Sequence, residues 1–205
     1  GPSTTGGSVF GIARTVVIPP ARVYRSVAGV IGATEDEIAL VDNATRAWDM
    51  AFYSMSFASG DRILTTTTEY AANFIAYLQV AQRTGVRIEV VPDTPTGEID
   101  VAALENMLDD RVKLISINHV PTNGGLVNPA AAVGSVARDA GVTFLLDACQ
   151  SVGQMEIDVD EIGCDVLSAT SRKFLRGPRG VGFLYVRDTL IESLDPVSLD
   201  LHAAT

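Results

Sequence analysis

Five side chains with different chemistry follow two apolar runs in the second half of the sequence. They are Asp147, Gln150, Thr170, Arg172 and Lys173. In an open α/β sheet, ligands bind where the carboxyl ends of neighbouring strands meet. If the two apolar runs are such strands, then an acid, an amide, a hydroxyl, a guanidinium and an amine share one binding site.

Lys173 permits two interpretations. A lysine after a strand is usually a surface residue. However, a positive neighbour and a pocket with little water can also activate a lysine amine to form a Schiff base. Thr170 and Arg172 lie within three residues of Lys173, and a hydroxyl with a forked guanidinium suits a phosphate group. This context favours the functional interpretation.

Asp147 ends an apolar run, where a carboxylate can pair with an arginine or cap the following turn. It can also hold a pyridinium nitrogen in its protonated state, which makes pyridoxal 5'-phosphate (PLP) an electron sink. Gln150 would reach the phenolic oxygen of the same ring from the same turn. An acid, a phosphate-binding cup and an amine together predict PLP as the cofactor.

Three further positions have both a structural and a functional interpretation. A predicted helix is preceded by Asn43, Ala44 and Thr45. This segment is either an ordinary N-cap or an anion site at the helix N-terminus. Tyr70 opens another helix, and as a single aromatic it is more typical of the core than of a ring-stacking position. Asn123 is a turn residue or a polar substrate contact, and the pattern does not separate these two.

Other kinds of site have little support. The GPRGVG segment at 177–182 lies between two predicted strands and does not open a helix, as a dinucleotide fingerprint would. The two histidines, His119 and His202, provide too little for a histidine metal cluster or a Ser-His-Asp triad. We therefore expect no metal, and we interpret His119 as structural.

Strands and helices alternate along the chain, and several strands are apolar throughout. This predicts a three-layer α/β fold with a mainly parallel sheet between helices. The last three strands lack long helices between them, so one of them is expected to run antiparallel. The predicted strands are 37–41, 62–66, 86–91, 112–120, 142–148, 165–171 and 181–187. The predicted helices are 23–31, 46–56, 69–84, 101–108 and 129–140.

The composition limits the class of protein. The 205 residues carry a net charge of −10 with scattered basic residues, which argues against nucleic acid and anionic membranes as partners. No apolar run reaches the roughly 18 residues that cross a bilayer, and no signal-peptide pattern opens the chain. Two cysteines without a CxxC pair fit a reducing, cytoplasmic setting.

Four motifs, in order, carry a family resemblance. They are Glu69-Tyr70, Pro121 to Pro129, Leu146 to Gln154, and Arg172 to Gly180. With them the chain resembles the large domain of class V aminotransferase-fold PLP enzymes, in the branch of cysteine desulfurases, carbon–sulfur lyases and isopenicillin N epimerase-like proteins. The resemblance implies the PLP-dependent transferase fold type I. We expect residues 1–22 to form an N-terminal arm and 23–205 the PLP-binding large domain, with the family's C-terminal small domain absent.

The resemblance also implies roles for these residues. Lys173 would form the Schiff base and later move the Cα proton, while Asp147 would pair the pyridine nitrogen and Gln150 the phenolic oxygen. The helix start at Ala44 and Thr45 would hold the phosphate.

Five more positions receive roles from the family. Thr170 and Arg172 would complete the phosphate site, and Tyr70 would stack on the ring. Thr122 or Asn123 lies where relatives place an asparagine near the substrate carboxylate. Arg172 and Tyr70 both stand where cysteine desulfurases have a histidine, which weakens that particular assignment.

The resemblance implies an enzyme that acts on a small-molecule amino acid. We expect a carbon–sulfur lyase that performs β-elimination on a cysteine-derived substrate, and a homodimer. An aminotransferase or epimerase of the same fold is one alternative. A truncated, non-catalytic PLP-binding scaffold is the other.

Overall fold

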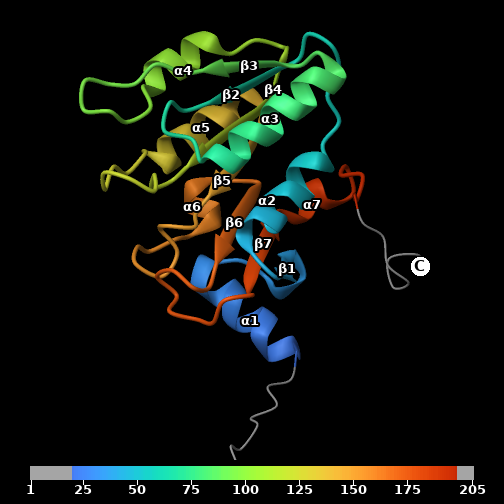
Figure 1. The fold of residues 1–205 in the computed structure, drawn as a ribbon, viewed down its shortest axis with the longest axis vertical. Helices are drawn as coiled ribbons and strands as arrows, with labels where there is room; N and C mark the ends of the chain where they lie inside the picture. The colour runs from blue at the N-terminus through green and yellow to red at the C-terminus, as the bar shows by residue number, and fades with distance from the viewer. Residues whose placement is uncertain (1–19, 198–205) are drawn as a thin grey trace, which may run out of the picture.

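The computed structural model describes residues 20–197. They form a seven-stranded sheet, and helices flank it (Figure 1). The strands are β1 (Ile38–Val41), β2 (Arg62–Thr65), β3 (Arg87–Val90), β4 (Val112–Asn118), β5 (Thr143–Asp147), β6 (Val166–Thr170) and β7 (Gly182–Val186). Their order across the sheet is β1-β7-β6-β5-β4-β2-β3.

The sheet is parallel through its larger part. Strands β3, β2, β4, β5 and β6 pair in parallel, whereas β7 pairs antiparallel with both β6 and β1. The expectation of a mainly parallel sheet, with one antiparallel strand among the last three, is therefore confirmed.

Helices cover both faces of this sheet. They are α1 (Pro20–Ile31), α2 (Ala44–Tyr53), α3 (Ala71–Thr84), α4 (Val101–Met107), α5 (Ala130–Ala140), α6 (Val159–Ile162) and α7 (Asp188–Ile191), with a 3-10 turn at Glu35–Glu37. Figure 1 shows α2 and α3 in front of the strands and α5 behind them. Within residues 20–197, no helix is both long and apolar enough to span a membrane.

The strand side chains alternate between two apolar cores. On β4, Leu114 belongs to the core that α2 and α3 cover, and the next residue, Ile115, belongs to the core on the other face, which includes residues of α1, α4, α5 and α6. On β5, Leu145 likewise belongs to the core on the α2–α3 face, and Leu146 belongs to the core on the opposite face. Because successive strand residues point to opposite faces, a strand covered on both sides must be apolar at every position. This accounts for the unbroken apolar runs in the sequence.

The structure agrees with the predicted elements to within three residues at each end. The first helix begins at Pro20, not Val23, so residues 20–22 are helical. Proline is favoured in the first turn because no helical hydrogen bond is lost there. The 3-10 turn, α6 and α7 were not predicted, because elements of three or four residues are too short to show periodicity. The rest of the expected arm, and His202, lie outside the described residues.

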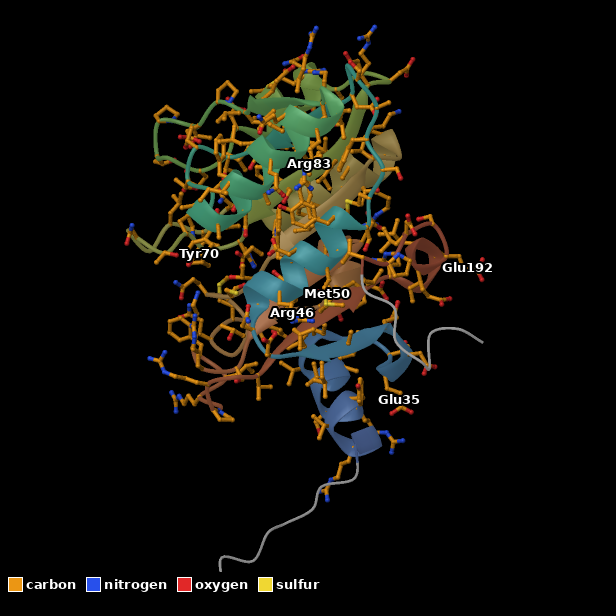
Figure 2. The ribbon with its side chains drawn as sticks, turned by 45° about the vertical axis from the view of Figure 1, so that its right-hand side comes forward. Glu35, Arg46, Met50, Tyr70, Arg83 and Glu192 are labelled. Atoms are coloured by element: carbon orange, nitrogen blue, oxygen red, sulfur yellow. The ribbon has the colours of Figure 1, made fainter. Side chains whose placement is uncertain are left out.

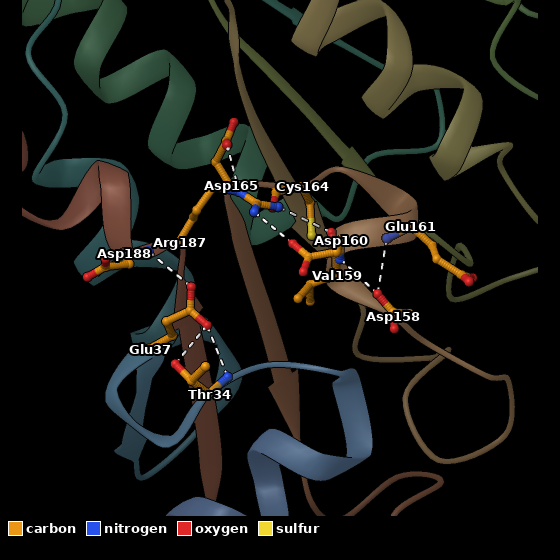
Figure 3. A network of polar contacts seen from close by, with 10 residues as sticks. All are labelled: Thr34, Glu37, Asp158, Val159, Asp160, Glu161, Cys164, Asp165, Arg187 and Asp188. Carbon is orange, nitrogen blue, oxygen red and sulfur yellow. Dashed lines mark hydrogen bonds and ion pairs between the residues drawn. The ribbon is translucent and has the colours of Figure 1, made fainter.

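Arg187 ties the antiparallel strand β7 to the neighbouring turns (Figure 3). Its Nη1 pairs with Asp160 at 2.8 Å and its Nε with Asp165 at 3.3 Å. Its Nη2 also donates to the carbonyl of Cys164 at 2.9 Å. Asp165 in turn accepts the backbone N–H of Phe144 at the start of β5. One guanidinium therefore joins the end of β7 to α6 and to the turn before β6, and Asp165 extends this link to β5.

We expect Arg187→Ala to lower the free energy of unfolding by about 1–3 kcal/mol, because it leaves the partly buried carboxylate of Asp165 and the carbonyl of Cys164 without their guanidinium donor. Arg25→Ala is the matched control, since Arg25 pairs with Glu35 at 3.4 Å in the open, and it should change stability by less than about 0.5 kcal/mol. Urea unfolding of both variants measures the difference. Equal losses would contradict this role for Arg187.

Candidate functional site

A cleft lies at the carboxyl ends of β4, β5 and β6, against the first residues of α2 and α3. Its lining residues are Asn43, Ala44, Thr45, Tyr70, Asn73, Asn118, Val120, Thr122, Asp147, Cys149, Gln150, Thr170, Arg172 and Lys173. Asn118, Asp147 and Thr170 are the last residues of their strands. This is the edge of the sheet at which the sequence predicts a ligand site.

The cleft brings together all but one of the predicted site residues. Asn123 does not line it, and its side chain is exposed in the loop that follows β4. Thr122 from the same loop does line it. His119 is buried and lies outside the lining, and burial lowers its pKa.

Both carboxylate oxygens of Asp147 are held in place. Oδ1 accepts the backbone N–H of Cys149 at 2.9 Å, and Oδ2 accepts Nδ2 of Asn73 at 3.2 Å. Only 8% of Asp147 is exposed, yet the residue lines the cleft. The carboxylate is therefore fixed in orientation, with one side available to a ligand.

Lys173 lies in the turn after β6, and backbone hydrogen bonds close this turn. Ser171 donates to the carbonyl of Val181 at 3.0 Å, and Gly177 donates to the carbonyl of Ser171 at 2.8 Å. Arg176 has a φ of 56°, a left-handed conformation that is uncommon for a residue with a side chain. The turn thus directs the half-buried Lys173 toward the cleft.

The sequence contains one other lysine, Lys113. Lys113 is exposed on β4, where its Nζ donates to the carbonyl of Asp110 at 2.7 Å. It does not line the cleft. Any amine chemistry of a lysine in this cleft therefore belongs to Lys173.

The N-terminus of α2 forms a second wall of the cleft. Asn43 is its N-cap and accepts the N–H of Arg46 at 2.8 Å, so Thr45, the other predicted cap, is a first-turn residue. The first N–H groups of a helix have no partner within the helix and favour an anion. Ala44 and Thr45 present this end to the cleft, close to Thr170 and Arg172.

Gly182 makes this approach possible. A Cβ on Gly182 would lie 2.8 Å from the backbone carbon of Asn43 and 2.9 Å from the carbonyl oxygen of Ala169. Real Cβ atoms do not approach backbone atoms so closely. The start of α2 can therefore pack against β7 and β6 only where the strand has no side chain.

Tyr70 is not a core residue, which corrects the structural interpretation of this position. Its side chain is 44% exposed and lines the cleft. Figure 2 shows it at the start of α3, on the side of the molecule where the loops after the strands lie. An exposed ring beside a fixed carboxylate can cover one face of a flat ligand.

The sequence did not predict the polar residues at the back of the cleft. Asn73 and Asn118 are buried and line it. Glu69 is half-buried beside them, and its removal from water together with the nearby Asp147 raises the pKa of Glu69 to about 7. The signal for these residues was the spacing of four between Glu69, Asn73 and Tyr77, which puts Asn73 and Tyr77 on one face of α3 and Glu69 just before its start.

The fold and the cleft define a class of protein: an α/β domain with one lysine, a fixed carboxylate and a helix N-terminus at the carboxyl edge of its sheet. Residues 20–200 match the family model for class-V aminotransferases. The chain belongs to this family.

Named relatives agree with this assignment. The chain is 30% identical over 197 residues to a "Probable cysteine desulfurase" of Methanothermobacter thermautotrophicus, covering 96% of this chain and 49% of that protein. The chain thus spans about half the length of that curated relative.

Solved structures of similar proteins share the fold. The apo cysteine desulfurase of Thermococcus onnurineus superposes with a TM-score of 0.82 at 27% identity, covering 88% of this chain and 46% of that one. The cystine C–S lyase C-DES, in complex with its product cysteine persulfide, superposes with a TM-score of 0.81 at 26% identity, covering 87% and 49%. A further C-DES structure holds glycine covalently linked to the PLP cofactor.

The Lys173 turn packs against Gly153, and this contact gives a prediction. Gly153 has a φ of 93°, and a Cβ there would lie 2.6 Å from the backbone carbon of Phe174. Gly124 has a similar φ of 96° with nothing within 4 Å. Both alanine variants carry the cost of a left-handed backbone, about 1–3 kcal/mol, but Gly153→Ala must also displace the turn, at about 1–3 kcal/mol more.

Thermal unfolding of Gly153→Ala and Gly124→Ala measures this difference. We expect the lower midpoint for Gly153→Ala. Equal midpoints would show that the turn carrying Lys173 does not depend on the contact with Gly153.

Proposed function

We propose that the chain binds PLP through Lys173 and takes part in breaking a carbon–sulfur bond of a cysteine-derived amino acid. The observation that carries this proposal is the meeting of Lys173, Asp147 and the α2 N-terminus in one cleft. An amine, a carboxylate and an anion site are the three groups that the aldehyde, the pyridine nitrogen and the phosphate of PLP require.

The residues of the cleft fit the two ends of the cofactor. The first N–H groups at Ala44 and Thr45, with Thr170 and Arg172, would hold the phosphate, since a guanidinium and a helix N-terminus both favour an anion. Asp147 would bind the protonated pyridine nitrogen at the other end. Its buried, doubly hydrogen-bonded carboxylate has little freedom to turn away.

Two further residues would place the ring. Gln150 lies in the turn directly after Asp147 and would contact the phenolic oxygen. Tyr70 would cover one face of the ring from the start of α3. Thr122 would face the substrate carboxylate, because it lines the cleft, and we do not extend this role to Asn123, which does not line it.

When bound, PLP withdraws electrons from the substrate's Cα and makes its proton acidic. Lys173 would take that proton, because it is the amine that lines the cleft. Cys149 also lines the cleft, but burial and the nearby Asp147 raise the pKa of its thiol well above the ordinary value. A thiol held protonated is a poor nucleophile, so Cys149 is not the group that attacks sulfur.

The family members named above support sulfur chemistry, since their names are cysteine desulfurase and cystine C–S lyase. The positions of Arg172 and Tyr70, where desulfurases have histidines, favour the lyase. A homodimer stays a prediction from the resemblance.

The cofactor proposal is tested by the visible absorption of the purified chain with added PLP. We expect a band, shifted from that of free PLP, in the wild type and in Lys113→Ala, because Lys113 is remote from the cleft. Lys173→Ala should show free cofactor only. The same spectrum for all three proteins would contradict the proposal.

The reaction is tested by product analysis with a cysteine conjugate as substrate. Elimination with uptake of water gives pyruvate, ammonia and a thiol, and these are the expected products. Transfer of the amine to an added keto acid would indicate an aminotransferase instead, and inversion at Cα an epimerase. Cofactor binding without any turnover would favour a scaffold.

A further inference from the structure

A chain of hydrogen bonds runs from the cleft into the core of the protein. It starts at Asp147, whose Oδ2 accepts Nδ2 of Asn73 at 3.2 Å. The same Nδ2 donates to Oε1 of Glu69 at 3.0 Å. Oε2 of Glu69 accepts the hydroxyl of Tyr77 at 3.1 Å, and that hydroxyl also contacts Ser116 at 2.7 Å. Two carboxylates are thus joined by one amide nitrogen.

Glu69 has only neutral hydrogen-bond partners in the described part of the chain. Besides Asn73 and Tyr77, they are the hydroxyl of Thr65 at 3.2 Å and the backbone N–H of Tyr70 at 2.6 Å. The charged group that acts on it is the like-charged Asp147. A half-buried carboxylate that is shielded from water and has no cation beside it holds its proton to higher pH than usual, and the pKa of Glu69 is raised to about 7.

A purely structural role accounts for only part of this arrangement. Glu69 accepts the N–H of Tyr70 and so satisfies a donor at the start of α3. A neutral glutamine would satisfy the same donor without the cost of burying a charge. The structural role therefore does not explain why an ionisable group is placed behind Asp147 and linked to it through Asn73.

We propose that Glu69 is a positioning residue that acts through Asn73 to set the orientation of Asp147 and the electrostatic field at its carboxylate. This inference rests on the proposed function, in which Asp147 binds the protonated pyridine nitrogen. The amide of Asn73 has two N–H groups, and they restrain the two carboxylates relative to each other. When Glu69 loses its proton, a second negative charge lies behind Asp147 and strengthens its hold on a cationic group in the cleft.

Among residues 20–197, few other titratable groups face this pair. Tyr77 packs on Glu69 from α3, and burial raises the pKa of its hydroxyl, so Tyr77 stays neutral near pH 7. Cys149 lies beside Asp147 with its thiol pKa raised by burial. Lys173 and Arg172 act on Cys149 from the cleft side. Within this set, Glu69 is the group with a pKa raised to about 7.

The test is a pH titration of the Asp147 carboxyl carbon by NMR, on the full chain without added cofactor. Asp147→Asn assigns the resonance. We expect a step near pH 7 in the wild type, because ionisation of Glu69 changes the field at Asp147. In Glu69→Gln the step should be absent. A purely structural role for Glu69 predicts no such step.

Tyr77→Phe is the second variant and keeps the test valid if Glu69→Gln does not fold. The Tyr77 hydroxyl lowers the pKa of Glu69, so its removal should move the step to higher pH by about one pH unit. Identical titration curves in the wild type and Glu69→Gln would overturn the proposal. So would a step that Tyr77→Phe leaves unmoved.

Failure of this inference and failure of the proposed function are distinguishable. The NMR step is measured without cofactor, whereas cofactor binding is read from the visible band and its loss in Lys173→Ala. A step near pH 7 without any cofactor band would leave the coupling intact and overturn the proposed function alone. A Lys173-dependent band without the step would leave the proposed function intact and overturn the inference about Glu69 alone.

Discussion

The structure depends on the register of the three central parallel strands. Asn118 at the end of β4 pairs with Asp147 at the end of β5, and Asp147 pairs with Ser168 of β6. This register brings a buried amide and a buried carboxylate to one edge, and it places Thr170 at the start of the turn that carries Lys173. Because side chains alternate along a strand, a shift of one residue would turn Asp147 into the opposite core.

Two close backbone contacts then complete the cleft. The start of α2 packs on β7 and β6 because Gly182 has no Cβ, and the Lys173 turn packs on the turn at Gly153 for the same reason. Neither contact is a hydrogen bond or an ion pair. The anion-binding helix end and the lysine are thus positioned by steric fit, while the orientation of Asp147 is fixed by hydrogen bonds.

The network behind Asp147 joins the cleft to the core on the α2–α3 face. Tyr77 belongs to both, because its ring packs against Trp48 and Phe52 and its hydroxyl contacts Glu69. A well-packed ring has one low-energy orientation, so its hydroxyl has one position. The apolar core therefore helps to fix the polar partners of the site.

Much of the fold and the cleft could be predicted from the sequence. Apolar runs and glycine stops gave the strands and helices, and polar residues at strand ends gave Asp147, Gln150, Thr170 and Lys173. Asn73 and Glu69 were missed because a polar residue within a helix is usually exposed, and only the three-dimensional arrangement shows what it contacts. Only the interpretation of Tyr70 as a core residue was wrong, and for the converse reason, since the sequence does not show whether an aromatic ring beside a helix is covered by other parts of the chain.

The most direct test of the account is to locate the cofactor on the chain. Reduction with borohydride makes a lysine–cofactor bond permanent, and peptide mass spectrometry then shows which of the two lysines carries it. The account predicts the added mass on the peptide that contains Lys173, and none on the peptide that contains Lys113. Added mass on Lys113, or on neither peptide, would contradict it.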